Sequence, residues 1–99
     1  MANITDIHRK DATLEVKPGR GFNLWTRNMV ESHLHPGITR LRLDMSRSNR
    51  IDSEGVIFLH RWLQSGKELE LIQPPPVLFE ILDILELKDM WDLEAIVTR

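Results

Sequence analysis

The second half of the chain contains two short segments of alternating apolar and polar residues with a helical segment between them. Residues 38–45 and 68–72 alternate, which is typical of strands with one buried side. Residues 53–64 carry apolar side chains at three- and four-residue spacing, which indicates an amphipathic helix, and Gly66 is a suitable residue to end it. A strand, a helix and a strand in this order predict a βαβ unit with parallel, neighbouring strands and a right-handed crossover.

The polar sides of these two strands carry opposite charges. Arg40 and Arg42 of the first strand would face Glu68 and Glu70 of the second, and such cross-strand pairs are mildly stabilising. Because one side of each strand is charged, we expect helices to cover only one face of the sheet.

The rest of the chain supplies further elements of the same kind. Leu14 and Val16 would point inward from one more strand, and Phe22, Trp25 and Met29 would lie near one face of a first helix. The expected elements are a strand at 12–17, a helix at about 23–34, a helix from the triple proline to about Leu87, and a last short strand or helix at 93–98.

Length and composition narrow the class of protein. A chain of 99 residues makes one small domain, so we expect residues 1–99 to form a single α/β domain with a four- to five-stranded mixed sheet. The formal net charge of −2 argues against nucleic acid as the main partner. There is no cysteine, no apolar run long enough to span a membrane and no signal peptide, so a cytoplasmic location is expected.

One short element, Asp52-Ser53-Glu54-Gly55, places a hydroxyl residue where a polar segment gives way to the helix. Serine is a common N-terminal cap, and the same backbone N–H groups can hold a phosphate. Ser53 is therefore either a plain helix cap or a phosphoacceptor.

The surroundings of Ser53 suggest a contact surface. The apolar arc of the helix leaves Ser53 on the opposite, solvent-facing side, and Ile57 lies there one turn later, as a scattered apolar residue or as a contact for a partner. A phosphate on Ser53 would add about −1.5 to −2 charges. Asp52 and Glu54 would oppose it, whereas Arg50 and Arg47 in the preceding loop would partly offset it.

The other groups of residues that could form a site do not indicate a cofactor or catalysis. His33 and His35 lack the spacing of metal ligands, and His60 is expected to be an exposed helical residue. Gly19 and Gly21 lack the lysine of a phosphate-binding loop. Since no nucleophile has an adjacent base, we do not expect an enzyme.

The series of elements from the strand ending in Asp44, through Asp52-Ser53-Glu54-Gly55, to the Leu-rich helix after the triple proline resembles the STAS domain, the family of bacterial anti-sigma factor antagonists. The resemblance covers about residues 38–93 and extends to the first third only by its layout. There are two departures. Glu54 stands where the family usually has Ser or Thr, and Gly19-Arg20-Gly21-Phe22 stands where it often has Gly-Glu-Leu-Asp.

The resemblance implies partners and roles. It makes Ser53 the phosphoacceptor of a serine kinase that doubles as an anti-sigma factor, with a serine phosphatase reversing the modification. It also implies a surface for that partner on a protein that is a monomer or weak dimer. The expected partner-binding residues are Asp44, Arg47, Arg50, Asp52, Glu54, Gly55 and Ile57.

Two functions remain open. The first is this phosphorylation-controlled partner switch, and the second is a non-switching STAS subunit that braces the ATPase of a lipid-transport ABC complex. A domain cut from a larger sensor or transporter is not expected, because the chain starts at Met1 and fills the domain.

Overall fold

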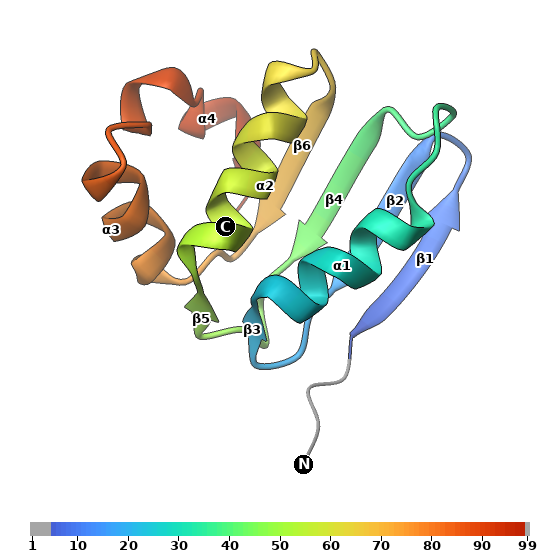
Figure 1. Ribbon diagram of the computed structural model, residues 1–99, viewed down its shortest axis with the longest axis horizontal. Coiled ribbons are helices and arrows are strands. Elements are labelled where there is room, and N and C mark those ends of the chain that lie inside the picture. Colours follow the sequence, from blue (N-terminus) through green and yellow to red (C-terminus); the bar gives the residue numbers. More distant parts are fainter. Residues whose placement is uncertain (1–4, 99) are drawn as a thin grey trace.

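The main sheet contains five strands in the order β1-β2-β4-β6-β7, in a computed structural model that describes residues 5–98 (Figure 1). β1 runs antiparallel to β2, whereas the other neighbours are parallel, so the predicted mixed sheet is confirmed. The strands are β1 (Asp6–Lys10), β2 (Thr13–Lys17), β4 (Arg40–Asp44), β6 (Glu68–Ile72) and β7 (Val97–Thr98).

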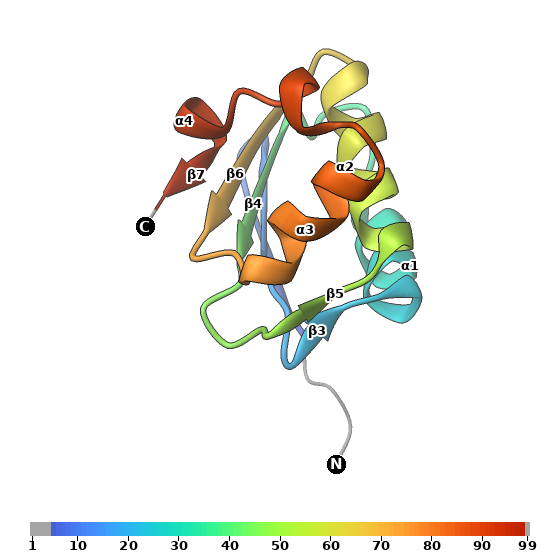
Figure 2. The ribbon, with the colours of Figure 1, turned by 90° about the vertical axis from the view of Figure 1, so that its left-hand side faces the viewer.

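Three helices cover one face of this sheet, as predicted (Figures 1 and 2). They are α1 (Leu24–His33), α2 (Ser53–Gln64) and α3 (Pro76–Ile84). α3 ends before the predicted Leu87, because Glu86 adopts a left-handed backbone conformation with φ 58° and turns the chain into the short 3-10 helix Lys88–Met90. The single-turn helix α4 (Leu93–Ile96) lies at the β7 edge, away from the layer of the other helices (Figure 2).

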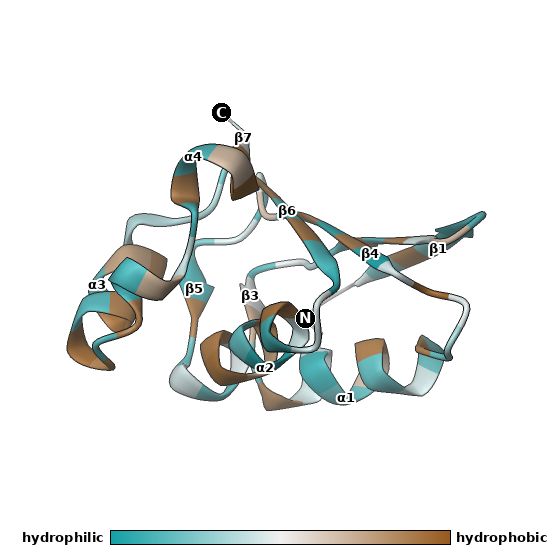
Figure 3. Ribbon diagram, turned by 90° about the horizontal axis from the view of Figure 1, so that it is seen from above, coloured by the Kyte–Doolittle hydropathy of each residue, from teal (hydrophilic) through white to brown (hydrophobic). Residues whose placement is uncertain are grey.

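The predicted βαβ unit is formed by β4, α2 and β6. The register places Arg40 opposite Glu68 and Arg42 opposite Glu70, and Arg40 bonds to both glutamates at 3.2 and 2.8 Å. Along the strands, hydrophobic and hydrophilic residues alternate (Figure 3). Their apolar side chains point toward the helices, so the sheet is dry on one face and wet on the other.

The core lies between the sheet and the helices. α2 buries Val56, Phe58, Leu59 and Trp62 in it, which confirms the predicted apolar arc. The prediction for α1 was wrong in part. Phe22 is fully buried, but Trp25 is 79% exposed and Met29 44% exposed.

The orientation of α1 is set by its first turn. Asn23 caps the helix by accepting the Thr26 N–H, and the Thr26 hydroxyl donates to the carbonyl of Gly21 at 3.3 Å. These contacts turn Thr26 and Val30 toward the core, and the larger apolar residues of α1 therefore remain in solvent.

A second, smaller sheet was not predicted. β3 (Gly21–Phe22) pairs in parallel with β5 (Arg50–Ile51), just before α1 and α2 respectively. Strands of two residues show no alternation that a sequence pattern could reveal. This pair joins the loop after β2 to the loop after β4.

The carboxylates on the solvent-facing side of the sheet predict that the protein loses stability in acid. The hydrogen bond from Arg40 lowers the pKa of Glu70 and outweighs the effect of partial burial. Partial burial would raise the pKa of Asp44, but hydrogen bonds from Ser46 and the charges of Lys17 and Arg42 lower it overall. A carboxylate with a lowered pKa stabilises the fold above its unfolded-state pKa, about 4, and this contribution disappears as the pH falls through the folded-state pKa.

Urea unfolding at a series of pH values should show this acid limb. Glu70→Gln should flatten it, because the variant has no carboxylate to protonate at that position. Glu80→Gln is the matched control, since Glu80 is exposed on α3 and forms no ion pair within residues 5–98. A Glu70→Gln profile as steep as that of the wild type would contradict the prediction.

Candidate functional site

The start of α2 is capped by Asp52 and not by Ser53. The Asp52 carboxylate accepts a hydrogen bond from the backbone N–H of Gly55 at 2.8 Å, and Ser53 is the first residue of the helix. The reading of Ser53 as a plain cap is therefore wrong. Ser53 is exposed, and no side chain or backbone group of residues 5–98 hydrogen-bonds to its hydroxyl.

Gly55 lies under this helix start and is buried against Phe22. A Cβ atom at position 55 would stand 2.6 Å from a ring carbon of Phe22 and 2.9 Å from its carbonyl oxygen. The same carbonyl accepts the backbone N–H of Asp52 at 3.2 Å. Glycine thus lets α2 approach the small sheet closely, and position 55 is buried beneath Asp52 and Ser53.

Glu54 connects the start of α2 to α1. Its carboxylate accepts a hydrogen bond from the guanidinium of Arg27 at 3.3 Å, and Arg27 also lies 3.4 Å from Glu31. Ile57 follows one turn later on α2 and is half-buried. An Ile57→Ala change would therefore remove some packing as well as exposed surface.

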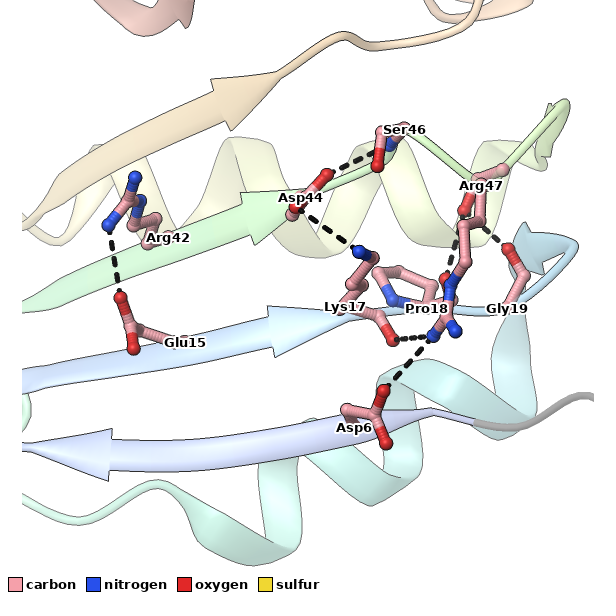
Figure 4. Close-up of polar contacts among 10 residues, drawn as sticks. Asp6, Glu15, Lys17, Pro18, Gly19, Arg42, Asp44, Ser46 and Arg47 are labelled. Carbon is pink, nitrogen blue, oxygen red and sulfur yellow. Dashed lines mark hydrogen bonds and ion pairs between the residues drawn. The ribbon is translucent and has the colours of Figure 1, made fainter.

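A basic cavity of about 850 Å³ opens beside Asp52. It lies between the loop after β2 and the loop after β4, and Arg20, Arg47 and Arg50 are among its lining residues. Arg47 also donates to the carboxylate of Asp6 at 3.1 Å and lies 3.4 Å from the carbonyl oxygen of Lys17 (Figure 4). The structure thus brings Arg47, Arg50 and Asp52 together, and Ser53 follows directly.

Asp44 is not part of this cavity. It ends β4 on the wet face, where it accepts the N–H of Ser46 at 3.0 Å and lies 3.9 Å from Lys17 (Figure 4). Its contacts shape the first turn of the loop that continues to Arg47. Asp44, at the end of β4, thus stabilises the start of this loop.

The prediction that His60 is simply exposed was wrong. Its ring is half-buried and stacks on Trp91, and Nδ1 accepts a hydrogen bond from the Trp91 indole N–H at 3.0 Å. This contact fastens the segment after α3 to α2. The helical pattern around His60 could not reveal it, because the partner lies far along the chain.

Two further observations restrict the chemistry of the described part of the chain. Within residues 5–98, no three histidine or carboxylate side chains are grouped as metal ligands would be. No helix of the same residues has the length and apolar character needed to cross a membrane.

These features define a class of domain: a mixed sheet with helices on one face and an exposed hydroxyl at the start of the helix between its central strands. A model of the family described as "Mlab, STAS domain" matches residues 27–97, which is most of the chain. The protein therefore belongs to the STAS domain family. Among curated proteins, no sequence matches it.

Solved structures show the same fold at low sequence identity. The Bacillus cell fate determinant SpoIIAA in its phosphorylated form is 10% identical, with a TM-score of 0.70, and the match covers 96% of this chain and 89% of that one. The unphosphorylated form of the anti-sigma factor antagonist SpoIIAA is 15% identical, with a TM-score of 0.66, over 94% and 93% of the two chains. Mglu, at 19% identity and a TM-score of 0.52, matches over 72% of this chain and 19% of its own.

Proposed function

We propose that this protein is a regulatory binding module that exchanges partners through reversible phosphorylation of Ser53. The observation that carries the proposal is the free, exposed hydroxyl of Ser53 at the first position of α2. The helix already has its cap in Asp52, so a kinase could modify Ser53 without removing a contact that holds the fold. The partner surface would comprise Arg47, Arg50, Glu54 and Ile57 around this residue.

A phosphate at this position would act on binding by its charge. It would add about −1.5 to −2 charges next to the carboxylates of Asp52 and Glu54, which the helix N-terminus and Arg50 would partly offset. The domain would keep its fold, but a partner would have to bury a charged, hydrated group, which is costly. Phosphorylation would therefore release the partner by local repulsion.

The proposed partners are a serine kinase that doubles as an anti-sigma factor and a serine phosphatase. SpoIIAA, whose fold this chain shares, is an anti-sigma factor antagonist with a phosphorylated form. We carry its mode of regulation to this chain as part of the proposal. The protein itself would be a non-enzymatic binding module, since no side chain of the described residues accepts a hydrogen bond from the Ser53 hydroxyl as a general base would.

Mapping phosphate by mass spectrometry, on protein purified from its own cells, tests the acceptor. We expect phosphate on Ser53 and none on Ser48, which is buried and donates its hydroxyl to the carbonyl of Gly19 at 2.8 Å. Ser46 is the matched control, because it is exposed in the same loop region. Phosphate on Ser46 with Ser53 unmodified would reject the assignment.

A second candidate is a fixed STAS subunit that braces the ATPase of a lipid-transport ABC complex. One observation favours it: the matching family model is described as "Mlab, STAS domain". In that role the Ser53 hydroxyl would be a permanent contact. The genes next to this one separate the candidates, because kinase and phosphatase genes support the switch and permease and ATPase genes support the fixed subunit.

A further inference from the structure

The exposed apolar residues of α1 lie on a definite flank of the helix. Arg27 marks the flank that faces α2, since it bonds to Glu54. Trp25 and Met29 are each two positions from Arg27, which places both about 160° around the helix from it. They therefore lie on the flank away from α2, and Figure 1 shows that this is the β1 side of the molecule.

β1 is an open edge of the main sheet. It is the first strand in the sheet order, and within residues 5–98 nothing pairs with its outer side. The backbone N–H and C=O groups on that side are available to a further strand. An open edge beside an exposed tryptophan is the kind of surface that another chain can cover.

The charges of β1 favour a second copy of this chain as the partner for this edge. If two copies of β1 pair antiparallel about a two-fold axis through His8, Asp6 of each copy stands opposite Lys10 of the other. Both residues point to the wet face, where Asp6 already forms an ion pair with Arg47 (Figure 4). Lys10 forms no ion pair with residues 5–98. Exposed charges usually protect an edge strand from pairing, but in this register they have opposite signs.

The helix side of such a pair also fits. Neighbouring strands lie about 4.8 Å apart, so the β2 strands of the two copies would be about 14 Å apart across both β1 strands. Helices in contact lie about 8–10 Å apart, so a wider separation between the two α1 helices would need large side chains on their facing flanks to fill it. Trp25 and Met29 of both copies would face this gap.

We propose that this protein forms a two-fold dimer through its β1 edge, with Asp6 paired to Lys10 of the second copy and Trp25 and Met29 packed across the axis. The dimer has one continuous sheet of two domains. The start of α2 is on the other flank of α1, so Ser53 stays accessible in it. The dimer is independent of the function proposed above.

Charge exchange tests the register by analytical ultracentrifugation over a wide range of protein concentration. Asp6→Lys alone sets two lysines opposite each other, and Lys10→Asp alone sets two aspartates opposite each other. Each variant should raise the dissociation constant of the dimer by at least about tenfold. An equimolar mixture of the two variants restores both attractive pairs and should dimerise about as well as the wild type.

The mixture separates the interface from folding effects, because mixing leaves each chain unchanged. Trp25→Ala should also weaken the dimer. Ile84→Ala is the matched control, since Ile84 is 78% exposed, as Trp25 is at 79%, but lies on α3. A wild type that stays monomeric at all concentrations, a mixture no better than its components, or weakening by Ile84→Ala instead of Trp25→Ala would each overturn the proposal.

Discussion

Replacing Phe22 with alanine should lower the free energy of unfolding by about 3–5 kcal/mol, the usual cost of emptying a buried aromatic site. Phe22 is fully buried, stacks on Phe58 with ring centroids 6.1 Å apart and lies against Gly55. The start of α2 thus packs against the side chain of Phe22. Urea unfolding, followed by circular dichroism, measures the change.

Gly55→Ala provides the test of this contact. Alone it should cost about 1–3 kcal/mol, because the new methyl group overpacks against the Phe22 ring and carbonyl. In the Phe22→Ala background the cost should be smaller, since the ring is gone and only the carbonyl remains. Additive costs in the double variant would show that the two residues act independently.

Ser53→Asp should weaken binding of the partner at least about tenfold, or 1.4 kcal/mol, because it introduces negative charge at the proposed interface. Its effect on stability should be below about 1 kcal/mol, since an acidic residue suits the first turn of a helix. The partner is identified by a pull-down with the Ser53→Ala variant, and its affinity for each variant is measured by titration. Binding as tight as that of the wild type would favour the fixed-subunit function.

Thermal melting of neighbouring variants provides the control. Asp52→Ala removes the observed cap and should cost about 0.5–2 kcal/mol. Ser53→Ala should cost little, because the Ser53 hydroxyl makes no hydrogen bond with the described residues. If Ser53→Asp unfolds the protein while Asp52→Ala does not, the position of Ser53 at the helix start must be different.

The elements with a clear period were predictable from sequence. α2 and β6 have the predicted bounds, and β4 lies within the predicted segment 38–45. The pairing of Arg40 with Glu68 follows from the register of two parallel strands. The spacing of apolar residues in each strand and helix of a βαβ unit is set within a short segment, so it can be recognised from the sequence. Burial on one side then determines which residues must share a face.

The missed features depend on contacts between distant residues or on positions shifted by a single residue. The short strands β3 and β5 acquire their conformation from each other, and His60 from Trp91. The cap is Asp52 and not the neighbouring Ser53; aspartate and serine are equally suitable caps, and only the hydrogen bond to Gly55 distinguishes them. Trp25 and Met29 of α1 are exposed because the hydrogen bond of Thr26 sets the orientation of the helix, and the pattern of apolar residues does not reveal this bond.

The small sheet of β3 and β5 has a mechanical consequence. It joins the backbone just before α1 to the backbone just before α2, so the two helix starts share one support. Local opening of one should therefore open the other, and the two segments should behave as a single cooperative unit in which amide exchange is correlated. A partner that binds at the start of α2 would therefore also affect the backbone at the start of α1.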